Sequence, residues 1–489
     1  DTECRNVIAK LPNYKEYLQL PEYINCVKLL KKGIAYHHSG VAPIIREMVE
    51  TVFAKGYIKL LFATETFAVG INMPTRTVIF TDVSKYDGNN MRFLLSHEYT
   101  QMAGRAGRRG LDTVGHVIHC MNMYDVIPSD TEMRILLNGK PQRLTSKFKV
   151  HYNMLLNTIN TGYTVTDIVD YIKSSMTNLE LFDEESRLNN EISLMQDVIA
   201  KQQAHCFTSG YDAVKQYADL QEQLKMASNK KRKQIERELK SMETKTLTQD
   251  VEIYRGFVKE REQLDKLYAT LMNVEQYVLT QTKSTLNVLT EKEFIAKNDI
   301  DTYTLTEKGQ IAITVQEMHS LVFADLFKQT NGMRQLDVVE IIQFLSCFTN
   351  VTIIEKHKTF LSETIISDNL VGLIKQTEEL YNYYYDVEAK HNIEPGCDYV
   401  LHYDMIEYIK DWCESETEQQ SRVVFFKMEN EKGIFLGEFI KAILKIVTFT
   451  NEIRNLSKQL NYLDTYEKLQ NVEDLLLKFV VTNQSLYLN

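Results

Sequence analysis

The chain has 489 residues, with 56 lysines and arginines against 66 acidic residues, so its net charge is −10. Hydrophobic residues make up 44% and charged residues 25%, which excludes a disordered or fibrous protein and predicts about three domains. No run of about eighteen apolar residues occurs, so we expect no membrane-spanning helix. The seven cysteines form no CxxC pair, which predicts an intracellular, soluble protein without disulfides or a zinc site, nuclear or cytoplasmic.

The first residues, DTECRNVIAK, are charged and lack an apolar core, so they do not form a signal peptide. They also lack an initiating methionine. We therefore expect a fragment or a processed product of a longer protein.

Turn-forming residues and basic charge gather at the front of the chain. Six of the seven prolines lie at or before Pro141. Residues 1–120 carry a net charge of +4, so the remainder carries −14. These shifts predict a compact, mildly basic first domain followed by a long acidic helical assembly.

Within the front piece, short apolar runs alternate with helical patterns. The runs at 58–64, 77–80 and 116–120 predict buried strands of a parallel sheet. The patterns at 43–55 and 96–106 predict helices. Strands that alternate with helices indicate an α/β layer.

The middle of the chain has the pattern of a long helical hairpin. Residues 184–205 and 264–278 carry apolar side chains at spacings of three and four, which predicts two antiparallel helices in a coiled-coil stalk. The basic run NKKRKQIERELK (229–240) lies between them. We interpret it as a solvated helix face rather than a nucleic-acid grip, by about three to one. From about residue 310, helical spacing continues and predicts an all-helical C-terminal domain.

The segment QMAGRAGRRG (101–110) has the residue types that bind a multiply charged phosphate. Arg105 and Arg108 are three apart, so on a helical turn they would point the same way, and guanidinium groups stay charged and donate in a fork. Gln101 can hydrogen-bond a phosphate oxygen or an attacking water. The simpler alternative is a surface loop whose arginines pair with acids such as Asp112.

A second segment, FATETFAVGINMP (62–74), follows a predicted strand. Thr64 and Thr66 lie at the strand end, and Gly70 and Asn72 lie in the loop. Ligands of open α/β sheets bind at the carboxyl ends of strands, where hydroxyl and amide groups can reach a phosphate chain. The alternative for Thr64 is a helix cap.

A third segment, YHHSGV (36–41), ends another predicted strand. His37 and His38 would face opposite ways on a strand, which is poor geometry for a metal. We interpret both as packing residues and predict no metal site.

Taken together, and in their order along the chain, the three segments resemble the second RecA-like domain of superfamily-two DExH helicases of the superkiller and nuclear exosome-helicase group. Residues 139–157 resemble the entry to that group's winged-helix domain, and YTLTEKGQIA (303–312) resembles the part after its arch insertion. The ending SLYL (485–488) is similar to the end of its DSHCT helical domain. The resemblance implies five segments. Residues 1–125 would form the second RecA-like domain, clipped at its start, and residues 319–489 would form the DSHCT bundle. Between them, residues 126–182 and 286–318 would form the first and second parts of the winged helix, and residues 183–285 would form a stalk without a KOW barrel.

The same resemblance implies that ATP binds between two RecA-like domains. It makes Gln101, Arg105 and Arg108 the catalytic and ATP-binding residues of motif VI, with both arginines as fingers on the γ-phosphate. It makes Gly70 and Asn72 ATP-binding residues of motif V.

For single-stranded RNA, the resemblance implies contacts from Ser39, Gly40, Thr64 and Thr66. It also implies a ratchet helix that starts near Gly437 and carries Lys441 and Lys445, where the family tends to have arginine; two solvated lysines are an even alternative. Residues 82–94 occupy the place of the strand-separating hairpin, with Tyr86 as its aromatic.

The chain also departs from the family. It contains no GxxxxGK[ST] and no DExH sequence, so the phosphate cradle and the acids that hold Mg²⁺ would belong to a first RecA domain, supplied in cis or in trans. We expect an ATP-dependent RNA helicase whose partner is an exosome-like nuclease, and we expect this polypeptide alone to be inactive. The alternatives are a non-catalytic RNA-binding scaffold and a related DNA helicase.

Overall fold

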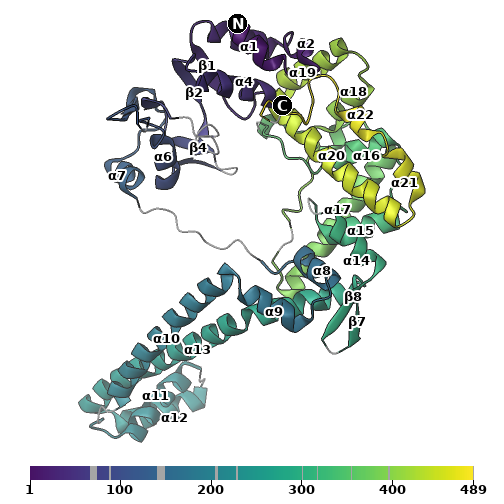
Figure 1. The fold of residues 1–489 in the computed structure, drawn as a ribbon. Coiled ribbons are helices and arrows are strands. Elements are labelled where there is room, and N and C mark those ends of the chain that lie inside the picture. Colours follow the sequence, from purple (N-terminus) through teal and green to yellow (C-terminus); the bar gives the residue numbers. More distant parts are fainter. Residues whose placement is uncertain are drawn as a thin grey trace. The chain divides into compact units, whose positions relative to one another are not determined.

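The computed structural model forms two compact units (Figure 1). The first unit contains Asp1–Leu144, Leu305–Lys390 and Glu394–Asn489, and the second contains Thr145–Thr304 and His391–Ile393. The residues that the structure describes are 1–65, 74–86, 90–108, 110–139, 149–203, 207–226, 229–299, 301–315, 318–353, 355–394 and 397–487.

The first unit opens with a small α/β layer. Its elements are α1 (Thr2–Ile8), α2 (Tyr14–Tyr17), α3 (Pro21–Leu30), β1 (Ile34–His37), α4 (Pro43–Ala54) and β2 (Leu60–Ala63). Strands β1 and β2 pair in parallel, with Ile34 opposite Leu60. Helices α3 and α4 pack on β1, and the side chains of Ala35 and His37 are buried.

A second α/β layer follows in the same unit. Its elements are β3 (Thr77–Phe80), β4 (Ser84–Tyr86), β5 (Met91–Phe93), α6 (Ser96–Ala103), β6 (His116–His119), the 3₁₀ turn η1 (Met121–Met123) and α7 (Asp130–Asn138). Strands β3 and β6 pair in parallel, and β4 and β5 form an antiparallel hairpin. Phe80, Tyr99 and Leu136 belong to one buried apolar cluster that joins β3, α6 and α7.

The predicted parallel pairing is confirmed, but the predicted burial of the strands is wrong for β2 and β6. The side chain of Phe62 is 58% exposed and that of Ile118 is 47% exposed. The described parallel strands pair two by two. In the first pair the helices cover β1, so β2 keeps an open surface.

The second unit contains the stalk (Figure 1). Its elements are α8 (Tyr152–Asn160), α9 (Val165–Lys173), α10 (Met176–Gln203), α11 (Tyr211–Met226), α12 (Asn229–Met242), α13 (Lys245–Glu291), β7 (Ile295–Asp299) and β8 (Thr302–Leu305). Helix α13 is about 70 Å long at 1.5 Å per residue. The apolar seam predicted between α10 and α13 is confirmed, because Leu188 and Ile192 pack against Leu271.

The chain does not pass directly from α10 to α13. Helices α11 and α12 lie between them, at the end of the stalk away from α8 and α9 (Figure 1). Val214 and Ile235 form one cluster with Val251 of α13. The apolar stripe of α12 is short and interleaved with charge, so its spacing is weak in the sequence.

The rest of the first unit is helical, as predicted. Its elements are α14 (Glu307–Thr314), α15 (Ser320–Gln329), α16 (Val338–Ser346), η2 (Glu355–His357), η3 (Leu361–Glu363), α17 (Asp368–His391), α18 (Ile406–Glu414), α19 (Glu418–Lys432), α20 (Leu436–Gln459), α21 (Leu463–Lys468) and α22 (Val472–Leu476). The ring of the buried Trp412 meets that of Phe439 edge-on, and its indole N–H donates to the carbonyl of Leu476 at 3.1 Å. Across the described residues, no helix combines the length and apolar character needed to cross a membrane.

Candidate nucleotide and RNA contact site

The predicted phosphate-binding arginines lie just beyond a helix, not on it. Helix α6 ends at Ala103, so the expectation that Arg105 and Arg108 share a helical turn is wrong. The backbone N–H of Thr75 donates to the carbonyl of Arg105 at 2.8 Å, and Gly107 has a positive φ of 96°. The helix cannot continue through this segment, because Arg105 pairs with Thr75 and Gly107 has a left-handed backbone conformation.

Arg108 makes a bidentate ion pair with Asp112. Its Nε lies 2.7 Å from Oδ2 and its Nη2 lies 2.9 Å from Oδ1. Hydrogen bonds from the Arg108 side chain lower the pKa of Asp112 to about 2. The simpler alternative from the sequence is therefore realised for this arginine. Because the guanidinium is still 45% exposed, it can exchange this carboxylate for a phosphate.

Gln101 and Arg105 flank the end of the same helix. Gln101 is exposed on the last turn of α6, and Arg105 is half-buried two residues after it ends. The structure thus brings all three predicted motif VI residues to one end of α6. It does not describe Thr66, Gly70 or Asn72, which lie outside the described residues.

The segment that contains Ser39 and Gly40 is seated on the first turn of α20. The backbone N–H of Gly437 donates to the carbonyl of Gly40 at 2.9 Å. A Cβ atom on Gly437 would lie 2.4 Å from the carbonyl oxygen of Val41, so only glycine fits this approach. Nearby, the ring of His38 meets that of Phe435 edge-on. The structure therefore joins the predicted RNA loop to the predicted ratchet helix.

Two lysines of α20 differ in their surroundings. The helix begins at Leu436, one residue before the expected start. Lys441 is exposed, whereas Lys445 is half-buried with Nζ 5.5 Å from the centre of the Phe449 ring. Their spacing of four places both on one face. Lys441 is the more accessible cation for a phosphate.

Thr64 lies at the carboxyl end of β2. It is exposed, and its backbone N–H donates to the carbonyl of His37 at 3.2 Å. The bond ties the end of β2 to the end of β1. Thr64 therefore lies beside the strand that leads directly into the Ser39–Gly40 loop.

The C-terminal tail reaches the same region, which the sequence analysis missed. Nε2 of His37 lies 2.6 Å from Oε1 of Glu50, and the Tyr487 hydroxyl donates to the other oxygen of that carboxylate. The backbone N–H of Leu486 donates to Glu47 at 2.5 Å. Burial disfavours ionisation of Glu50, but the bonds from His37 and Tyr487 outweigh it and lower its pKa. The sequence signal that could have pointed to this contact is the pair Glu47 and Glu50, which are three residues apart and so lie on one face of α4.

Glu98 ties the β4–β5 hairpin to α6. Arg92 donates to its two oxygens at 2.8 and 2.9 Å, and Lys85 donates at 3.0 Å. These bonds, led by those from Arg92, lower the pKa of Glu98 to about 2. The predicted hairpin is present, with Tyr86 exposed and opposite Met91.

A Glu98→Gln substitution should destabilise the chain by about 1 kcal/mol at neutral pH, allowing for solvent screening. Because the folded pKa is depressed, the stabilisation is present above the ordinary value near 4.5 and is lost as pH falls toward 2. Urea titrations across this range should show the two proteins converging in acid. Exposed Glu262→Gln is the control; a constant gap between Glu98→Gln and the parent protein would contradict the assignment.

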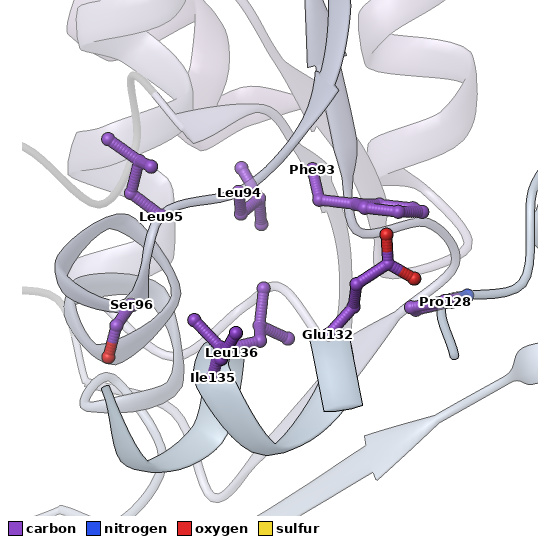
Figure 2. A pocket seen from close by; sticks show the side chains of 8 residues that line it. All are labelled: Phe93, Leu94, Leu95, Ser96, Pro128, Glu132, Ile135 and Leu136. Carbon is purple, nitrogen blue, oxygen red and sulfur yellow. The ribbon is translucent and has the colours of Figure 1, made fainter. Parts of the chain in front are cut away.

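A small apolar pocket of about 210 Å³ lies between the start of α6 and α7 (Figure 2). Leu94 and Leu95 face Ile135 and Leu136 across it. The carboxylate of Glu132 at its side accepts the Ser129 hydroxyl in a helix cap, and no predicted site residue lines the pocket. Over the described ranges, no group of three or more His, Cys, Asp or Glu side chains is arranged to hold a metal ion.

Two family models match the chain. The helicase conserved C-terminal domain matches residues 6–110, and the DSHCT (NUC185) domain matches residues 302–484. Each model matches less than half of the chain. The first match spans α6 and the arginine segment, and the second spans α20. The helicase-derived RecA-like fold followed by a mostly helical region is thereby established.

Curated relatives support the same group. The chain is 52% identical over 143 residues to the antiviral helicase SKI2 of Saccharomyces cerevisiae, which is 29% of this chain and 11% of that protein. It is 49% identical over 139 residues to human superkiller complex protein 2, which is 28% of this chain and 11% of that protein. It is 51% identical over 139 residues to the human exosome RNA helicase MTR4, covering 28% and 13%. The matched segment spans only about a tenth of each relative's length.

Proposed function

We propose that this SKI2- and MTR4-like chain is the C-terminal part of an ATP-dependent RNA helicase that unwinds RNA 3′ to 5′ in RNA processing or decay. One observation carries the proposal: the predicted RNA loop at Ser39 and Gly40 is seated on the first turn of α20, the helix that presents Lys441. A motor that couples nucleotide state to RNA movement needs a mechanical link of this kind between its α/β layer and its helical domain.

The residues at the end of α6 fit the arginine side of an ATP site. Arg108 is exposed and already holds an anion, the carboxylate of Asp112, in a fork that a γ-phosphate could take. Gln101, Arg105 and Arg108 would contact that phosphate. ATP bound there would supply the phosphoryl group, and the two cations would stabilise the charge that develops on it.

The remaining site residues follow from the same proposal. Thr66, Gly70 and Asn72 lie inside the segment matched by the helicase model, and with Thr64 they would line the RNA and ATP faces of motif V. Mg²⁺ would be held by acids of the first RecA domain. We also propose the five segments given above as domains and an exosome-type nuclease complex as partner, because relatives carry superkiller complex and exosome in their names.

The proposal is tested by separating the two halves of the motor. The chain alone should show no RNA-stimulated phosphate release, because it lacks a phosphate-binding loop. Joining it to the first RecA domain of its own full-length protein should produce RNA-stimulated ATP hydrolysis. Turnover by the chain alone would contradict the prediction. RNA binding without hydrolysis in the joined protein would favour a scaffold, and stimulation by DNA rather than RNA would favour a DNA helicase.

A further inference from the structure

The β4–β5 hairpin brings two positive charges together. Lys85 of β4 lies directly opposite Arg92 of β5 in the register of the two strands. Like charges in that position destabilise a strand pair unless other groups neutralise them. A two-stranded hairpin is also only marginally stable by itself, so these short strands need ties to the rest of the protein.

Two carboxylates from different elements neutralise the pair. Glu98, on the first turn of α6, accepts hydrogen bonds from both Arg92 and Lys85. Glu65 lies two residues after the end of β2, and its Oε2 is 2.6 Å from Nζ of Lys85, against 3.0 Å for Oε1 of Glu98. The bond to Glu65 contributes most to raising the pKa of Lys85. The network of two cations and two carboxylates is therefore balanced in charge.

The two carboxylates tie the hairpin to different parts of the first unit. Glu98 also accepts the backbone N–H of Leu95 at 2.7 Å, so it belongs to the packing of the second α/β layer. Glu65 belongs to the first α/β layer and directly follows Thr64, a predicted RNA contact. The Glu65–Lys85 bond therefore joins the two layers at the hairpin. The side chain of Lys85 is only 23% exposed, so solvent shields this bond less than an ordinary surface pair.

We infer that Glu65 is a positioning residue for strand separation, because through Lys85 it holds the predicted strand-separating hairpin to the end of β2. A hairpin that meets a duplex transmits force only if both of its strands are held. Arg92 and Glu98 hold β5, and the bond from Glu65 holds β4 to the segment that begins at Thr64. The inference rests on the proposed function, since it assigns a role within RNA unwinding.

The test uses the protein that joins this chain to its first RecA domain, with RNA-stimulated phosphate release and unwinding of a 3′-tailed RNA duplex measured on the same preparations. The variant Glu65→Gln removes the ion pair with β4 and leaves the bonds between Arg92 and Glu98 in place. The matched control is Glu3→Gln, because Glu3 pairs with Lys55 at the same distance of 2.6 Å and is similarly exposed. Circular dichroism melting checks that the variants stay folded.

Glu65→Gln should slow unwinding by about fivefold, as expected for the loss of one charge-assisted hydrogen bond, and should leave the rate of ATP hydrolysis within about twofold. A residue that only stabilised the fold would lower both activities together. Glu3→Gln should match the parent protein in both assays. Because Glu65 acts through Lys85, adding Glu65→Gln to Lys85→Met should slow unwinding no further than Lys85→Met alone.

Each other outcome overturns the inference. If Glu65→Gln unwinds RNA as fast as the parent, or if hydrolysis and unwinding fall by the same factor, Glu65 does not position the hairpin and the proposed function stands. A further loss in the double variant would show that Glu65 acts through a contact other than Lys85. A parent protein that hydrolyses ATP with RNA but does not unwind the duplex would overturn the proposed function together with the inference.

Discussion

Alanine at Arg105 and Arg108 should reduce RNA-stimulated ATP hydrolysis by at least about 10³-fold in a protein that joins this chain to its first RecA domain. Arginine fingers contribute about 10³–10⁵ in rate, because they stabilise charge on the transferring phosphoryl group. Single alanine variants should each lose most of that factor if both arginines touch the phosphate. Steady-state phosphate release at saturating RNA measures the effect.

The ion pair with Asp112 makes this prediction sharper. Asp112→Asn keeps the size of the side chain but removes the charge that holds Arg108 at 2.7 Å. If Arg108 must leave Asp112 to reach ATP, this variant should retain hydrolysis, with a KM for ATP equal to or below that of the parent. Arg187→Ala, which removes an exposed ion-paired arginine on α10, is the control and should change nothing. Full activity in the Arg105→Ala/Arg108→Ala variant would disprove the finger assignment.

Gly437→Ala should destabilise the first unit by about 1–3 kcal/mol and weaken RNA binding. The added methyl carbon would lie 2.4 Å from the carbonyl oxygen of Val41 and 2.7 Å from that of Ser39. Backbone atoms cannot yield as the end of a side chain can, so the loop and α20 must separate. Chemical denaturation and RNA titration of the same preparations measure the two effects.

Gly372→Ala provides a matched control for that substitution. Gly372 also lies in a helix, α17, but apart from its chain neighbours and the nearby backbone of α17 itself, no described atom lies within 4 Å of where its Cβ would be. Alanine there should stabilise the chain by about 0.5–1 kcal/mol, because it reduces the freedom of the unfolded chain. If Gly437→Ala behaves like Gly372→Ala, the close approach between the RNA loop and α20 is not present in solution.

Local sequence patterns predicted the elements well where one face of an element is apolar. The helix at 43–55 appears as α4 (Pro43–Ala54), and the seam of Leu188 and Ile192 pairs α10 with α13. Periodicity reports such faces directly, since burial selects every third or fourth residue. It failed at 101–110, where Gly107 and a backbone pairing with Thr75 override helical spacing.

The sequence by itself determined the helicase-type motifs, the parallel direction of the strands and the long helical hairpin, because these depend on residue types and spacing along a continuous segment. Only the tertiary structure decided the contacts between distant segments, which are Gly40 with Gly437, and His37 with Glu50 and Tyr487. Each of these depends on which surfaces meet after the chain folds back on itself. That outcome is set by packing among many residues and not by the pattern of any one segment.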